Sequence, residues 1–213
     1  QYERGWRKIQ LPVIRDLSIN IKGHEIVAVV GSSGSGKSLL AHAIMGILPY
    51  NSEMDGEIRF LGEPLTEKKI KRLRGHEIVL VPQSVSYLDP LMKIGDQIRN
   101  GKKDHSVKEK CLSVLKRYGL GKYPFQLSGG MTRRVLISTA VMEKPKLVIA
   151  DEPTPGLHLE AATRVMGHFR EMADDGAGVL LITHDLELAL LTADRVIVLY
   201  GGRVVEETDA AAF

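Results

Sequence analysis

The stretch GSSGSGKS, residues 31–38, restricts the fold of this chain more than any other part of the sequence. An apolar, β-branched run, EIVAVV, stands before it, and the helix-forming run LLAHAIMGIL follows it. The stretch fits G-x-x-x-x-G-K-[ST], a pattern that needs a strand before it and a helix after it. Its glycines permit backbone angles that side chains forbid, so successive amides can surround a phosphate. The alternative is a Gly/Ser-rich turn that binds nothing.

Two side chains at the end of this stretch carry the expected chemistry. In the pattern, the Lys37 ammonium lies against the β- and γ-phosphates of a nucleotide, and the Ser38 hydroxyl ligates Mg²⁺. Whether the next residue, Leu39, contacts the nucleotide is left open. The predicted ATP-binding residues of the loop are Gly31, Ser32, Ser33, Gly34, Ser35, Gly36, Lys37 and Ser38.

Apolar runs rich in β-branched residues recur along the chain. Their hydrophobicity is continuous rather than alternating, which is typical of parallel strands covered by helices on both faces. Helices are expected between them, over 37–48 and 158–175 among others. A last run, 195–207, is predicted to form a hairpin that turns at Gly201 and Gly202. The predicted strands are Glu25–Gly31, Gly56–Gly62, Glu77–Gln83, Lys146–Pro153 and Gly178–Asp185.

The span 86–143 differs from the rest because it is mostly helical and polar and has no predicted strand. We interpret it as a helical subdomain inserted into a core formed by 1–85 and 144–213. The whole of 1–213 is then one domain, a size that can bury a substantial core.

Composition limits the class of protein. The chain is 44% hydrophobic and 26% charged, as in ordinary globular proteins, and its net charge of +3 gives no argument for nucleic acid. The basic run Glu67–Gly75 is expected to be a solvated helix face. No apolar run approaches the roughly 18 residues that span a bilayer, and the first ten residues lack the apolar core of a signal peptide. The single Cys111 excludes an internal disulfide and suits a reducing compartment.

Acidic and polar residues follow three of the predicted strands. Asp151 is expected to hold Mg²⁺, and Glu152, which points the other way, to act as base for an attacking water. The alternative is that both are exposed charges in a loop. His184 is expected beside the γ-phosphate, although a lone histidine is more often structural. Gln83 ends its strand in the same way. An isolated glutamine at that place would normally be only a polar residue that terminates the strand.

A second glycine turn, LSGGM, begins at Leu127. With GSSGSGKS, Gln83, LVIADEP and His184, it resembles the ATP-binding cassettes, the nucleotide-binding subunits of ABC transporters, in the same order and over nearly the whole chain. The resemblance implies an α/β P-loop NTPase core of the RecA-like type, with an antiparallel β hairpin and an inserted α-helical subdomain.

The same resemblance implies roles for further residues. Two cassettes face each other head to tail, so Ser128 and the amides of Gly129 and Gly130 would bind the γ-phosphate of a neighbour's ATP. Ser128 is also expected to cap a helix. Adenine would stack on Tyr2, with Trp6 as the alternative. Catalysis would involve Glu152, His184 and Gln83, and the predicted Mg²⁺ ligands are Ser38, Gln83 and Asp151.

The resemblance also implies partners. These are a second cassette, identical or not, integral membrane permeases and, indirectly, an extracytoplasmic solute-binding protein, which places the chain on the cytoplasmic side of the membrane. The loop SVSYLDPLMKIGDQI after Gln83 would carry motion to a membrane subunit. This loop and LSGGM are similar to the peptide/nickel import branch, and GILP at 46–49 leans toward nickel.

One position departs from the family pattern. His158 stands where the family commonly has an aspartate that helps link the two nucleotide sites across the dimer. Its presence puts in question whether the two sites of this dimer are coupled and equivalent. The leading hypothesis is an ATPase that energises uptake of small peptides or nickel. The alternatives are a soluble ABC ATPase acting in repair or translation, and a regulatory module that binds ATP without hydrolysing it.

Overall fold

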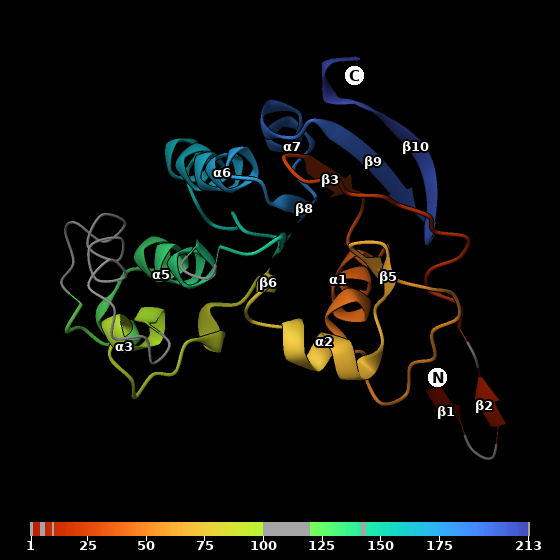
Figure 1. Ribbon diagram of the computed structural model, residues 1–213, viewed down its shortest axis with the longest axis horizontal. Coiled ribbons are helices and arrows are strands. Elements are labelled where there is room, and N and C mark those ends of the chain that lie inside the picture. Colours follow the sequence, from red (N-terminus) through yellow and green to blue (C-terminus); the bar gives the residue numbers. More distant parts are fainter. Residues whose placement is uncertain (1, 5–6, 10, 100–119, 142–143, 213) are drawn as a thin grey trace.

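The computed structural model describes residues 2–4, 7–9, 11–99, 120–141 and 144–212. A six-stranded sheet with the order β10-β9-β3-β8-β7-β6 forms its centre (Figure 1). Neighbouring strands from β9 to β6 run parallel, and β10 joins the edge antiparallel to β9. These strands are β3 (Ile26–Val30), β6 (Ile78–Val81), β7 (Leu147–Asp151), β8 (Gly178–Thr183), β9 (Arg195–Tyr200) and β10 (Arg203–Asp209).

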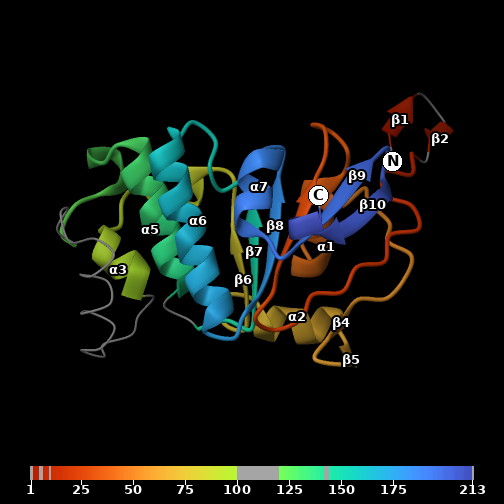
Figure 2. The same ribbon diagram turned by 90° about the horizontal axis from the view of Figure 1, so that it is seen from above.

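Helices cover both faces of the sheet, as the continuous hydrophobic runs predict (Figure 2). Alternate residues of β3 enter two different cores: Ile26 and Ala28 lie in one, Val27 and Val29 in the other, and all four are fully buried. The first core is closed by α5 (Gly129–Val141), α6 (Leu159–Asp174) and α7 (Leu186–Thr192), and the second by α1 (Lys37–Met45) and α2 (Glu67–Leu73). The α/β fold prediction is confirmed.

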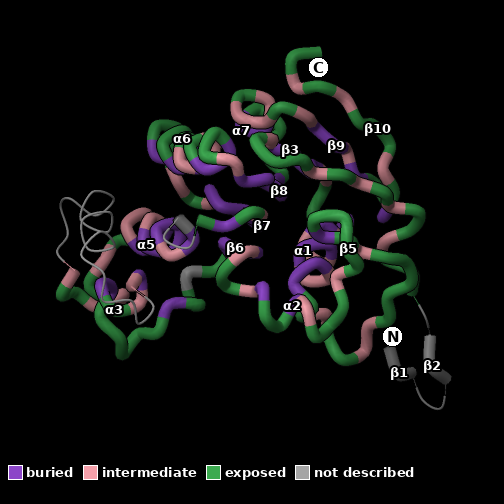
Figure 3. The backbone as a smooth tube through the Cα atoms, in the orientation of Figure 1, coloured by how far each residue is buried: buried purple, intermediate pink, exposed green. Residues whose placement is uncertain are grey.

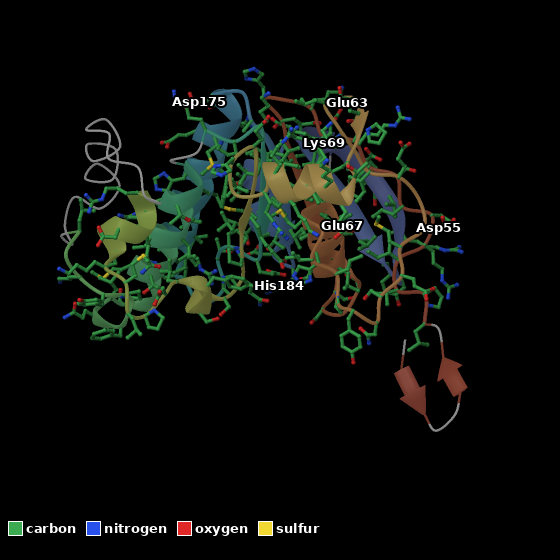
Figure 4. The ribbon with its side chains drawn as sticks, turned by 60° about the horizontal axis from the view of Figure 1, so that its bottom comes forward. Asp55, Glu63, Glu67, Lys69, Asp175 and His184 are labelled. Carbon is green, nitrogen blue, oxygen red and sulfur yellow. The ribbon has the colours of Figure 1, made fainter. Side chains whose placement is uncertain are left out.

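The prediction of a sheet strand over Gly56–Gly62 is wrong. Only β4 (Arg59–Phe60) forms there, and it pairs with β5 (Glu63–Pro64) in a separate two-stranded hairpin. In this run the apolar residues alternate with charged ones, so it lacks the continuous apolar character of a strand buried on both faces. Lys69 of α2 holds this hairpin through a 2.6 Å ion pair with Glu63, and that bond lowers the pKa of the Glu63 carboxyl (Figure 4).

Other predicted boundaries hold with small shifts. The helix expected over 37–48 ends at Met45 because Gly46 adopts a left-handed conformation, φ 63°, and closes the last turn. The helix α6 lies within 158–175, and β9 and β10 form the predicted hairpin, with positive φ at both Gly201 and Gly202. The strand before Gln83 ends two residues earlier than predicted, at Val81.

The region between the strands β6 and β7 has its own small apolar cluster. It contains α3 (Ile94–Arg99), α5 and the short 3-10 turns Val85–Tyr87 and Pro124–Gln126, and its described residues include no strand. Figure 3 shows buried positions on α3 and α5 as well as on the sheet. The subdomain boundaries 86–143 stay a prediction, and Cys111 lies outside the described residues. The cluster consists of Leu88, Ile94, Ile98, Val135 and Leu136.

A short hairpin stands at the N-terminal end of the chain. The strands β1 (Tyr2–Arg4) and β2 (Arg7–Ile9) pair antiparallel and extend away from the sheet in Figure 1. The adenine contact of Tyr2 stays a prediction, and the alternative, Trp6, lies outside the described residues. None of the helices in the part of the chain that the structure describes has the length and apolar character needed to cross a membrane.

Candidate active site

The parallel strands bring the predicted site residues to one edge of the sheet. Val30 pairs in register with Thr183, and Ala150, one residue before Asp151, pairs with Val81. The segments that follow these strands therefore leave the sheet at the same edge, which is where parallel α/β folds place their ligands. Chain segments that are more than 100 residues apart in sequence meet there.

The loop from Gly31 to Gly36 turns over this edge between β3 and α1. A Cβ atom on Gly31 would lie 2.2 Å from the Leu199 carbonyl oxygen, so no side chain fits at that position. Gly34 and Gly36 have φ values of 79° and 98°, which are typical of glycine. The helix α1 begins directly after this loop, so its first free amides and the positive end of its dipole lie at the same place.

Lys37 is only 6% exposed and points back over the loop. Its ammonium donates hydrogen bonds to the carbonyl oxygens of Gly31, at 2.7 Å, and Ser32, at 2.9 Å. A buried cation held by neutral carbonyls beside a row of amides is arranged to attract an anion.

Ser38, the next residue, joins α1 to the end of β7. Its hydroxyl donates a hydrogen bond of 3.2 Å to Oδ1 of Asp151. Burial raises the pKa of the Asp151 carboxyl; the Ser38 hydrogen bond opposes this rise, and the nearby Glu152 carboxylate adds to it. A desolvated carboxylate and a hydroxyl side by side are hard oxygen donors, the ligands that Mg²⁺ prefers.

Glu152 faces a different partner from Asp151. Its Oε2 lies 2.9 Å from Nδ1 of His184, which comes from the turn after β8. Glu152 is buried, while the His184 side chain is 66% exposed. The φ of Glu152 is 47°, an uncommon value for a residue with a side chain, and such outliers are concentrated at functional sites. A carboxylate held this way can accept a proton, and the imidazole can orient it.

Gln83 is exposed and follows β6, the sheet neighbour of β7. Its carbonyl oxygen accepts a 2.6 Å hydrogen bond from the guanidinium of Arg133, and the Pro82 carbonyl accepts a second at 3.1 Å. The sequence reasoning missed Arg133. The signal available for it was a charged residue at helical spacing from Leu136 and Ile137, three and four positions on, which are buried on the same face of α5.

The second glycine turn lies elsewhere on the molecule. Ser128 precedes α5 directly, and its carbonyl accepts hydrogen bonds from the amide and the hydroxyl of Thr132. Figures 1 and 2 both show α5 far from α1, with β6 and β7 between them. Ser128 and Gly129 are exposed, and a Cβ on Gly129 would meet no atom within 4 Å. The two turns of one chain therefore do not face each other.

His158, which departs from the family pattern, is the N-cap of α6. Its Nδ1 accepts a hydrogen bond of 3.2 Å from the Ala161 amide, as an aspartate oxygen does at such a position. The residue before it, Leu157, lies near Gly130: its Cδ2 is 3.5 Å from where a Cβ on that glycine would lie. The segment that leaves Glu152 therefore passes close to the second turn of the same chain.

Comparison with known proteins agrees with these features. The family model described as ABC transporter matches residues 14–155, which is most of the chain. The match includes the loop after β3 and the two carboxylates at the end of β7, Asp151 and Glu152. The chain belongs to the ABC transporter family. The resemblance predicted from the sequence motifs is thus confirmed.

Individual relatives give the same result. The chain is 37% identical over 214 residues to an oligopeptide transport ATP-binding protein of Mycobacterium tuberculosis, covering 91% of this chain and 35% of the relative. It is 36% identical over 215 residues to the dipeptide transport ATP-binding protein of Escherichia coli K12, covering 92% and 66%. The chain thus spans about one third to two thirds of the length of these ABC relatives.

A solved ABC cassette has the same fold. The dimeric structure of an ATP-binding cassette in a post-hydrolysis state, bound to ADP and Pi, superposes with a TM-score of 0.82 and is 27% identical in sequence. The match covers 100% of this chain and 96% of that one.

Proposed function

We propose that this chain is the subunit of an ABC importer that binds and hydrolyses ATP, with Mg²⁺, to energise uptake of small peptides. One observation carries the proposal: Lys37, the Ser38–Asp151 pair and the Glu152–His184 pair meet at one sheet edge. Each group suits one part of ATP hydrolysis, and the relatives named above are peptide transport ATP-binding proteins.

The phosphates are assigned to the first glycine loop. The amides from Gly31 to Gly36 surround the β- and γ-phosphates, and the ammonium of Lys37 moves from the loop carbonyls to the phosphate oxygens. Ser38, Asp151 and Gln83 would hold Mg²⁺, which would neutralise charge that develops on the phosphates and favour the ionised form of the buried Asp151 carboxyl.

The hydrolytic step is assigned to Glu152. As general base it accepts a proton from the attacking water, while His184 holds its carboxylate through Nδ1. Gln83 helps to orient the water and the ion from the neighbouring strand. Because the imidazole of His184 is largely exposed, it lies where a γ-phosphate can approach it.

The second turn, Ser128 to Gly130, is assigned to the nucleotide held by a facing cassette. Each γ-phosphate then adds charge-assisted hydrogen bonds across the interface, each worth roughly 1.5–3 kcal/mol. Hydrolysis and phosphate release remove these bonds, and the pair opens. The dimeric form of the similar cassette bound to ADP and Pi supports this cycle.

Partners and cargo follow from the same proposal. Exposed apolar side chains after Gln83, those of Tyr87, Leu91 and Met92, offer a surface to a permease at the cytoplasmic side of the membrane. The helical subdomain 86–143 carries this surface. A solute-binding protein outside the membrane selects the cargo. The names of the relatives favour oligopeptides or dipeptides over nickel, toward which GILP at 46–49 leaned within the peptide/nickel branch.

A phosphate-release assay tests the proposal. The chain with its partner cassette is expected to hydrolyse ATP with Mg²⁺ and to stop when EDTA removes the ion. Lys37→Ala is expected to lose ATP affinity in a fluorescence titration with a labelled nucleotide. The matched control is Lys146→Ala, at an exposed lysine that pairs with Glu77. A Lys37→Ala chain that binds nucleotide like the parent would contradict the assignment. Co-purification with ribosomes or DNA instead of membrane proteins would favour a soluble ABC ATPase.

A further inference from the structure

Arg133 is a charged residue in an apolar setting. It lies on α5 and is only 7% exposed, and burial lowers the pKa of its guanidinium. Buried cations normally pair with a carboxylate, because an isolated charge is costly to remove from water. Among the described residues no carboxylate forms an ion pair with Arg133. Its hydrogen bonds go to the main-chain carbonyls of Pro82 and Gln83.

These two carbonyls lie where the chain leaves β6. The Gln83 bond, at 2.6 Å, is short, as charge-assisted hydrogen bonds are. Because one nitrogen of the guanidinium holds two successive carbonyls, it fixes the direction of the backbone at Gln83. The planar, always charged guanidinium suits this task better than a flexible ammonium.

The helix α5 also holds the far end of the same loop. Val135 and Leu136, one turn or less beyond Arg133, pack in a buried cluster with Leu88 and Ile94. The loop that begins at Gln83 is therefore attached to α5 by hydrogen bonds at its start and by apolar contacts further on.

The same helix carries the second glycine turn at its N-terminus. Arg133 is five positions after Ser128, about 7.5 Å along an α-helix. A displacement of the Ser128 turn as a rigid part of α5 therefore also displaces the carbonyls that Arg133 holds.

We propose that Arg133 is a positioning residue that couples Gln83 of one nucleotide site to the Ser128 turn that serves the facing site. Binding of a facing γ-phosphate by the turn fixes α5, and Arg133 then places Gln83 for hydrolysis in its own site. The coupling rests on the proposed function, because that function assigns the first turn to the chain's own ATP and the second turn to the ATP of a facing cassette.

A double-mutant cycle tests the coupling. Arg133→Gln is expected to lower kcat about 10²-fold, the scale of a 1 Å misplacement, and to leave the Kd for ATP within about twofold. In a Gln83→Ala background, Arg133→Gln is expected to change kcat no further, because the residue acts through Gln83. If the double variant instead loses kcat by the product of the two single-variant factors, the two residues act independently and the proposal is overturned. Arg134→Gln, one position along the same helix, is the control and keeps the parent kcat.

A second measurement does not depend on hydrolysis. In the nucleotide-free chain, amide exchange at 83–88 is expected to be about tenfold faster in Arg133→Gln than in the parent or in Arg134→Gln. Unchanged exchange would overturn the coupling, whether or not the parent hydrolyses ATP; an inactive parent would count against the proposed function alone.

If Arg133→Gln fails to fold, Arg133→Lys, which keeps the charge, takes its place. It is expected to give intermediate kcat and intermediate exchange. If Arg133→Lys lowers ATP affinity and kcat by the same factor, Arg133 instead has a purely structural role.

Discussion

The two glycine turns of this chain differ in how the chain holds them. The first, Gly31 to Gly36, is anchored at its ends: Lys37 donates hydrogen bonds to the Gly31 and Ser32 carbonyls, and the Leu199 carbonyl leaves no space for a side chain at Gly31, while Ser32, Ser33 and Gly34 are exposed. The second, Ser128 to Gly130, is largely exposed: a Cβ on Gly129 would enter open space, and one on Gly130 would meet Leu157. In the function proposed above, the first turn belongs to a site built within the chain, whereas the second serves a nucleotide held by a facing cassette.

This difference has a mechanical consequence. The segment that leaves Glu152 passes close to Gly130 at Leu157, and Arg133 ties the helix of the second turn to Gln83. The first site and the second turn are therefore linked within the chain. Substitutions in the first site should change turnover or folding, whereas substitutions in the second turn should change association and leave folding intact.

The largest effect is expected from Glu152→Gln. The amide keeps a partner for His184 but cannot act as a base, so kcat should fall by about 10²–10⁴ with ATP affinity retained. A phosphate-release assay and a nucleotide titration measure the two quantities. Glu160→Gln, at an exposed residue of α6, is the control. Turnover at the parent rate in Glu152→Gln would show that another group is the base.

The comparison between the turns is tested most directly by paired glycine substitutions. Gly31→Ala places a methyl group 2.2 Å from the Leu199 oxygen and is expected to cost about 3 kcal/mol of unfolding free energy. Gly129→Ala enters open space, so its change should stay within about 0.5 kcal/mol, while ATP-driven dimerisation weakens. Urea unfolding and size-exclusion chromatography measure these outcomes. Equal destabilisation by both substitutions would remove the distinction.

A smaller effect is expected from Asp151→Asn in buffer without divalent ions. Burial raises the pKa of this carboxyl, so its ionised form is disfavoured in the folded state. The parent should then lose stability as pH rises from the ordinary pKa of 3.8 through the raised one, and at neutral pH Asp151→Asn should be the more stable. The Tm difference should disappear near pH 3.5, and Mg²⁺ should raise the Tm of the parent only. A difference that is constant with pH would argue against desolvation as its cause.

The smallest effect is expected at His158, on the segment that joins the two regions. His158→Ala removes the acceptor for the Ala161 amide and should cost about 0.5–1 kcal/mol. His158→Asp should restore this stability, because aspartate accepts the same bond and suits the helix dipole. Chemical denaturation measures both variants. Identical stability of all three chains would show that the cap contributes nothing.

Several elements were predictable from sequence because their signals are local. The loop Gly31–Ser38 has a fixed pattern between a strand and a helix, and Gly201 and Gly202 mark their hairpin. The prediction at Gly56–Gly62 failed because it relied on a few apolar residues, while the alternation with Glu57 and Arg59 pointed away from a strand covered on both faces. Local pattern alone could not decide which sheet that run would join.

The sequence by itself determined the chemical groups: a lysine after glycines, adjacent carboxylates after an apolar run, and a second glycine turn. Only the tertiary structure decided which of them act together. It paired Glu152 with His184 and Ser38 with Asp151, separated the two turns, and attached Gln83 to Arg133. The physical reason is that strand register and helix packing, which depend on contacts between distant segments, set these distances, whereas a sequence pattern records only neighbours along the chain.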